Sequence, residues 1–147
     1  AAECGVDGLI VPDLPPEEAV PLKDAAERAG LGLVFLATPE TEGRRIELIV
    51  RHTKGFLYLV SRYGTTGERD RLAEGLACLI GRVRERGGRV PIAVGLGISR
   101  PEHVRMVLEA GADGAVVGSR LVREVGKGAP PEALARFVRK LKDATLP

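Results

Sequence analysis

The sequence predicts an α/β protein in which a strand and a helix alternate five times along the chain. Short apolar runs rich in β-branched residues recur, and segments with helical periodicity separate them. Each run is almost continuously apolar, which is typical of parallel strands that are covered on both faces. The predicted strands are residues 9–12, 33–37, 56–61, 91–95 and 115–118.

The predicted helices have apolar residues at i, i+3, i+4 and i+7, so each presents one apolar face. These residues are Leu22, Ala25, Ala26 and Ala29; Leu72, Leu76, Leu79, Ile80 and Val83; Val104, Val107 and Leu108; Leu134, Phe137, Val138 and Leu141. Ser99 and Glu102 have the spacing of a capping box at a helix start. Gly30, Gly87 and Gly111 stand where helix C-caps are expected.

One pattern of residue types occurs twice in the chain. ECGVDGLIVPD begins at Glu3 and EAGADGAVVGS begins at Glu109. The second copy ends a helix and enters a strand, so residues 1–4 of the first copy should be the last turn of a helix. We therefore expect the chain to be the later portion of a longer protein. Both copies have the pattern Glu, small residue, Gly, small residue, Asp-Gly and three apolar residues, and only their endings, Pro12-Asp13 and Gly118-Ser119, differ in kind. This indicates that the shared part is scaffold and that the endings lie at the functional edge of the sheet.

Two architectures fit this element order. One is an open doubly wound sheet, and the other is the C-terminal part of a (β/α)8 barrel, which needs about 250 residues for eight units. Both place function at the carboxyl ends of the strands. We expect residues 1–147 to form a single domain in either case.

Composition excludes several classes of protein. The apolar share is 44% and the charged share 29%, as in soluble globular proteins. A net charge of +2 without a basic stripe argues against a nucleic-acid partner. The sequence has neither a recognisable signal peptide nor an apolar run near the roughly 20 residues of a membrane helix, so no membrane association is expected. Cys4 and Cys78 are far apart, which favours a reduced, cytoplasmic protein.

Glycine and serine at two strand ends predict an anion site. Gly118-Ser119 opens a helix and offers free N–H groups and a hydroxyl, and Gly97 lies in a glycine turn after the preceding strand. Barrels frequently build a phosphate site from their last two loops of this kind. Residues 61–71, with Arg62 and two threonines, are predicted to form a mobile ligand loop.

The sequence contains no Ser/His/Asp set, no metal-ligand cluster and no paired carboxylates suited to acid–base chemistry. His52 and His103 are expected to be exposed helix residues. Asp13 fits either a base or a cap of a helix and turn, and Tyr58 fits either face of its strand. The chain therefore carries residues suited to binding a ligand and lacks an obvious set of catalytic residues.

Four motifs, GVDGLIVPDLPPEE, FLYLVSRYGTTG, VGLGISRPEHV and ADGAVVGSRLV, resemble in order and spacing the α subunit of tryptophan synthase. The resemblance covers essentially the whole chain and corresponds to about the fourth to eighth strands of that family's TIM barrel. It implies a lyase of tryptophan biosynthesis that cleaves indole-3-glycerol phosphate to indole and glyceraldehyde 3-phosphate. It implies no cofactor in this chain and a PLP-dependent β subunit as partner, in an α-β-β-α complex.

The resemblance also implies roles for individual residues. The phosphate ligands would be Gly67, Gly97, Gly118 and Ser119. The walls of the indole pocket would be Ile10, Tyr58 and Leu96. Arg62 and Thr66 would belong to a loop that closes over substrate, and Asp13 and Pro15 would face the β subunit.

Leu96 stands where the family often has Phe, and Thr65 where it usually has Val. The family's two acidic catalytic residues lie on early strands, so no position in this chain inherits a catalytic role and the chain alone is expected to be inactive. Two alternatives stay open: a non-catalytic half-barrel that binds phosphate ligands or a partner chain, and another phosphosugar barrel enzyme.

Overall fold

The structure is a computed structural model that describes residues 1–60, 69–95 and 97–146 of the chain. Strands and helices alternate through the described part, and every strand pairing in it is parallel, as the sequence predicts. The strands are β1 Gly8–Ile10, β2 Gly32–Val34, β3 Leu36–Ala37, β4 Leu57–Val60, β5 Ile92–Gly95 and β6 Gly114–Ala115. The helices are η1 Ala2–Cys4, α1 Val20–Arg28, α2 Gly43–His52, α3 Arg69–Gly87, α4 Pro101–Glu109, α5 Ser119–Gly126 and α6 Pro131–Asp143.

The strand predicted over residues 33–37 is divided in two at Phe35. β1 pairs with β2 in one sheet, and the second sheet has the order β3-β4-β5-β6. The N–H of Phe35 donates to the Thr53 hydroxyl at 2.9 Å, and the Phe35 carbonyl accepts the Tyr58 N–H at 3.1 Å. A side chain therefore replaces the neighbouring strand on one side of Phe35, which explains why a continuous apolar run does not form a continuous strand.

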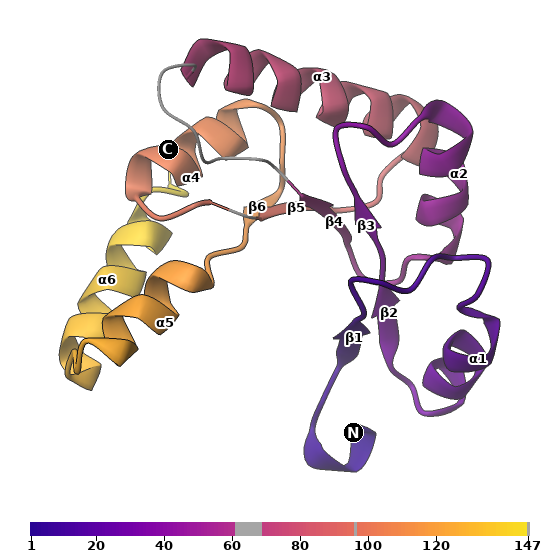
Figure 1. Ribbon diagram of the computed structural model, residues 1–147, viewed down its shortest axis with the longest axis horizontal. Helices are drawn as coiled ribbons and strands as arrows, with labels where there is room; N and C mark the ends of the chain where they lie inside the picture. The colour runs from indigo at the N-terminus through magenta and orange to yellow at the C-terminus, as the bar shows by residue number, and fades with distance from the viewer. Residues whose placement is uncertain (61–68, 96, 147) are drawn as a thin grey trace.

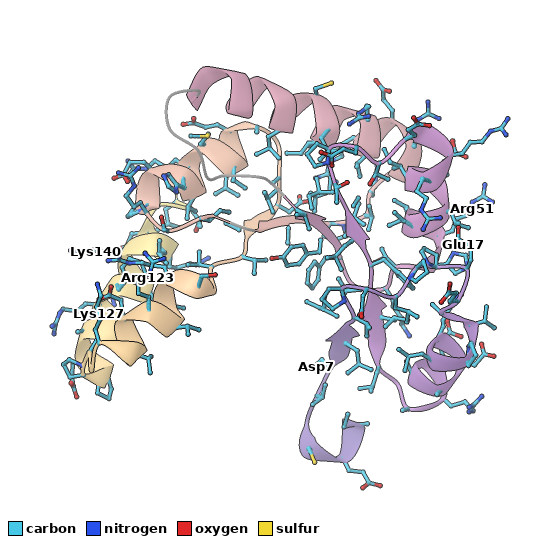
Figure 2. The ribbon with its side chains drawn as sticks, viewed as in Figure 1. Asp7, Glu17, Arg51, Arg123, Lys127 and Lys140 are labelled. Atoms are coloured by element: carbon cyan, nitrogen blue, oxygen red, sulfur yellow. The ribbon has the colours of Figure 1, made fainter. Side chains whose placement is uncertain are left out.

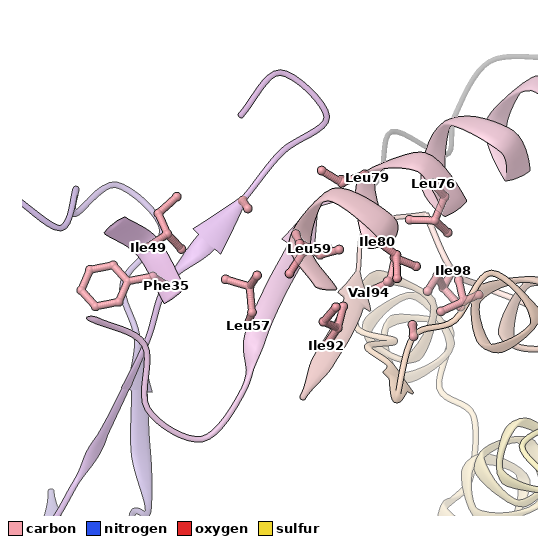
Figure 3. Packing of buried hydrophobic residues seen from close by; sticks show 14 of the residues in the cluster. Phe35, Ile49, Leu57, Leu59, Leu76, Leu79, Ile80, Ile92, Val94 and Ile98 are labelled. Atoms are coloured by element: carbon pink, nitrogen blue, oxygen red, sulfur yellow. The ribbon is translucent and has the colours of Figure 1, made fainter. Parts of the chain in front are cut away.

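The helices that contribute to the core pack on one face of the strands. Leu57 and Leu59 of β4 and Ile92 and Val94 of β5 are fully buried beneath α2, α3 and α4 (Figure 3). Figure 1 shows α2, α3 and α4 along this side of the four-stranded sheet, with α5 and α6 side by side beyond β6. One-sided helical cover is the arrangement of a barrel wall, whereas a doubly wound sheet has helices on both faces.

At the helix ends, some of the caps predicted from the sequence are confirmed and others are wrong. Gly30 and Gly111 adopt positive φ angles of 73° and 99° after α1 and α4, as predicted for C-caps. After α3 the glycine with a positive φ angle is Gly88 (φ 60°), one residue beyond Gly87, where the C-cap is predicted. The predicted capping box at Ser99 is wrong, because α4 has no side-chain cap hydrogen bond and its N-cap residue is Arg100.

The first residues form the single turn η1, which closes at Gly5 with φ 79°. This agrees with the expectation of a helical turn before β1. No helix in the described part of the chain combines the length and the apolar character needed to cross a bilayer.

Candidate functional site

Tyr58 lies on the face of β4 that the helices leave uncovered. Its neighbours Leu57 and Leu59 are fully buried on the helical face, and Tyr58 alternates with them in the strand. This settles the orientation that the sequence left open. Burial raises the pKa of the Tyr58 hydroxyl, so the side chain is neutral at physiological pH.

Gly95 at the end of β5 makes room for Tyr58. A Cβ atom built on Gly95 would overlap the hydroxyl end of the Tyr58 ring, with the ring carbon Cε1 only 2.8 Å away. The two residues belong to neighbouring strands, in which Tyr58 is paired with Ala93 and Val60 with Gly95. Glycine is therefore required at position 95 by close approach of a side chain, and not by an unusual φ angle.

A cavity of about 240 Å³ opens beside Tyr58 at the carboxyl ends of β5 and β6. It is lined by Tyr58, Gly97, Ile98, Ser99, Val116, Gly118, Ser119, Arg120 and Arg123. The structure thus brings together the predicted residues Tyr58, Gly97, Gly118 and Ser119. Gly97 has φ 81°, a conformation that L side chains rarely adopt.

The start of α5 supplies hydrogen-bond donors to this cavity. Ser119 is the first residue of the helix and Gly118 is its N-cap, with no side-chain cap hydrogen bond. The first N–H groups of a helix have no partner within it, and the helix dipole adds partial positive charge at the same end. This part of the cavity can therefore hold an anion such as a phosphate group.

Two arginines that the sequence analysis did not select also line the cavity. Arg120 is engaged elsewhere: its Nη2 lies 3.2 Å from Glu124 Oε1, and its guanidinium lies 5.5 Å from the centre of the Phe137 ring. Arg123 makes no side-chain hydrogen bond or ion pair with any described residue. It follows Ser119 by four residues, a spacing that places both on one helix face and could have identified it.

The loop after β1 holds Asp13 and Pro15 beside a separate cavity of about 350 Å³. Pro16 is buried, and an ion pair between Glu17 and Arg45 ties the loop to α2. The pKa of the Glu17 carboxyl is lowered by its own backbone N–H and then by Arg45. Asp13 stays exposed, and α1 begins only at Val20, so the alternative of Asp13 as a helix cap is wrong.

The other predicted site residues lie elsewhere or outside the described residues. Ile10 ends β1 in the two-stranded sheet, is 46% exposed and does not line the cavity at Tyr58. The predicted phosphate ligand Gly67, the pocket residue Leu96, and the loop residues Arg62 and Thr66 all fall outside the described ranges.

The two histidines are not the exposed residues that the sequence predicts. Both are half-buried. His52 Nδ1 lies 2.9 Å from the Leu48 carbonyl oxygen, and His103 Nδ1 accepts the Ser99 N–H at 3.3 Å. Among the residues that the structure describes, no group of three or more His, Cys, Asp or Glu side chains could hold a metal ion.

Comparison with known proteins gives one consistent family. The family model for the tryptophan synthase alpha chain matches residues 1–145. The tryptophan synthase alpha chain of Citrifermentans bemidjiense is 48% identical over 149 residues, covering 99% of this chain and 55% of the relative. That of Methanosarcina mazei is 46% identical over 147 residues, covering 99% of this chain and 53% of the relative.

Solved structures agree with the sequence comparison. A chain from the tryptophan synthase a2b2 complex of the hyperthermophile Pyrococcus furiosus superposes with a TM-score of 0.84 at 40% identity, over 96% of this chain and 57% of that one. The fold is therefore part of the TIM barrel of this family, as the one-sided helical cover indicates. The chain spans about half the length of the curated relatives it matches, and it belongs to the tryptophan synthase alpha chain family.

Proposed function

We propose that this chain supplies the phosphate site and part of the indole pocket for aldol cleavage of indole-3-glycerol phosphate, a lyase step in tryptophan biosynthesis. The observation that carries the proposal is the cavity that Tyr58 and the start of α5 both line. An aromatic wall and an anion site within one cavity match the two ends of this substrate. Family membership over residues 1–145 supports the same assignment.

The described residues account for binding and orientation. Gly97, Gly118 and Ser119 would hold the phosphate through N–H groups and the Ser119 hydroxyl. Arg123 would add positive charge at the same end of the cavity. The ring of Tyr58 would contact the indole, and a phosphate fixed at α5 would restrict how the rest of the substrate lies.

The bond-breaking step needs two proton transfers. The bond between indole C3 and the adjacent side-chain carbon breaks as that carbon's hydroxyl loses a proton and becomes the aldehyde of glyceraldehyde 3-phosphate. Indole C3 gains a proton in exchange. We assign the required acid and base to the part of the family chain that this protein does not match, because no described residue lining the cavity carries a carboxylate.

The same reasoning extends to partner and location. We propose that Asp13 and Pro15 contact a tryptophan synthase β subunit, because Asp13 is exposed on a loop that Glu17 and Arg45 hold in place. The cleavage itself needs no cofactor from this chain, and PLP would belong to that β subunit. We place the protein in the cytoplasm, where a biosynthetic enzyme meets its small-molecule substrate.

The proposal is tested by binding of glycerol phosphate, followed by NMR shifts of backbone amides. In the unchanged chain the amides of Gly118 and Ser119 should shift on titration. Ser119→Asp should abolish binding, because a carboxylate at the start of α5 repels the phosphate. The matched control is Gly126→Asp, which places the same charge at the far end of α5 and should leave binding within about twofold. Equal binding by both variants, or shifts at another site alone, would contradict the assignment.

A further inference from the structure

In the second copy of the repeated pattern, which begins at Glu109, the aspartate joins β6 to β5. Asp113 immediately precedes β6. Its Oδ2 accepts the N–H of Ile92, the first residue of β5, at 2.7 Å, and its own N–H donates to the Ile92 carbonyl at 2.9 Å. Arg84, in the last turn of the helix that leads into β5, approaches the same carboxylate at 2.6 Å.

We call Asp113 a connector, because three contacts join it to the strand before β6. Its carboxylate accepts the Ile92 N–H, its N–H donates to the Ile92 carbonyl, and its carboxylate pairs with Arg84 of α3. Burial alone would raise the pKa of the Asp113 carboxyl, but the Ile92 N–H and the Arg84 guanidinium outweigh it and lower that pKa. The carboxylate is therefore ionised at neutral pH, as both contacts require.

Asp7 occupies the same position in the first copy, immediately before β1. Its carbonyl accepts the Gly32 N–H at 2.9 Å, on the side of β2. Within the described part of the chain, neither its carboxylate nor its N–H has a hydrogen-bond or ion-pair partner. The two groups that Asp113 uses to engage the preceding strand are thus both free in Asp7, which Figure 2 shows at the start of β1.

The edge of β1 next to Asp7 is also free. β1 pairs with β2 alone among the described strands, so its other edge has no strand partner there. Val6, two residues before β1, is 38% exposed, and Ile10 at the end of β1 is 46% exposed. An unpaired strand edge with apolar residues beside it is a surface for adding another strand.

In a TIM barrel every strand pairs with the strand before it, so this edge of β1 is where the preceding strand of the family fold lies. We propose that Asp7 connects β1 to that strand, and that the helix leading into that strand ends in Arg or Lys. The occupant to which we assign this edge is a strand from the part of the family chain that this protein does not match, which is 47% of the Methanosarcina mazei relative, since the match covers 53%. The Asp7 carboxylate accepts the first N–H of the incoming strand and pairs with the basic side chain. The Asp7 N–H donates to the carbonyl of the same first residue.

The experiment co-expresses this chain with the unmatched portion of the Methanosarcina mazei chain and measures their association by affinity co-purification and titration. Asp7→Ala should weaken association by about tenfold or more, since it removes one charge-assisted contact and one hydrogen bond. Asp7→Asn keeps an acceptor oxygen and should lose less. The matched control is Asp24→Ala, an exposed carboxylate on α1 that should have no effect. Amide exchange at Asp7 should slow in the complex.

Several results would overturn the proposal. They are a lack of association on co-expression, association that Asp7→Ala leaves unchanged, and equal losses in Asp7→Ala and Asp24→Ala. A dimer of this chain alone that Asp7→Ala abolishes would assign the edge to a second copy instead. Association is measured without turnover or phosphate, so failure here is distinguishable from failure of the proposed lyase function.

Discussion

Replacing Gly95 with alanine should displace Tyr58 from the wall of the cavity. The added Cβ would overlap the hydroxyl end of the ring, and Cε1 would lie 2.8 Å from it, closer than real Cβ contacts allow. Overpacking of this kind costs about 1–3 kcal/mol of unfolding free energy. Because Tyr58 lies on the uncovered face of the sheet, its side chain has room to move away from Gly95, and we expect the chain to fold with Tyr58 moved.

The double variant isolates this contact. In a Tyr58→Ala background the clash is absent, so Gly95→Ala should cost less than about 0.5 kcal/mol, or stabilise by up to about 1 kcal/mol through reduced chain entropy. The coupling energy between the two positions should therefore be roughly 1–3 kcal/mol. Gly114→Ala is the control, because a Cβ on that β6 glycine would meet no atom within 4 Å.

The assay is urea and thermal unfolding of the four variants, together with titration of indole. Each 1 kcal/mol lost should lower the Tm by about 2–4 °C. Gly95→Ala should also weaken indole binding by about two- to twelvefold, the equivalent of one lost aromatic contact. If Gly95→Ala has the same cost with and without Tyr58, or if Gly114→Ala costs as much, the contact between Tyr58 and Gly95 does not determine the shape of this cavity.

Two further predictions concern stability. The folded-state pKa of Asp113 lies below its ordinary value of about 3.9, so its stabilisation is complete above about pH 5 and is lost as pH falls through the lowered pKa. Urea titrations of the chain and Asp113→Asn should differ by about 1–2 kcal/mol at neutral pH and converge in acid, and a constant difference would refute the role of the charge. Thr53→Val should cost about 1–3 kcal/mol by leaving the buried Phe35 N–H without an acceptor, whereas the control Thr145→Val removes only an exposed hydrogen bond to the Lys142 carbonyl and should stay within about 0.5 kcal/mol.

Features that depend on a few neighbouring residues were predictable from the sequence. The alternation of strands and helices, the C-caps at Gly30 and Gly111 and the start of α5 at Ser119 all follow from local periodicity and backbone freedom. The capping box failed for a physical reason. The Ser99 N–H donates to His103 Nδ1, and the helix takes Arg100 as its N-cap, so neighbouring groups compete for the same role that the motif assigns to Ser99.

Features that depend on which face of a strand is covered required the tertiary structure. An apolar strand such as β4 can present either set of alternate residues to the helices, and only packing under α2, α3 and α4 assigns Leu57 to the core and Tyr58 to the cavity. The meeting of Tyr58, Gly97 and Ser119 likewise depends on the parallel register of β4, β5 and β6. Local sequence patterns identify which kinds of residue stand at the strand ends, whereas packing and register bring some of them into one site because both depend on contacts between distant segments.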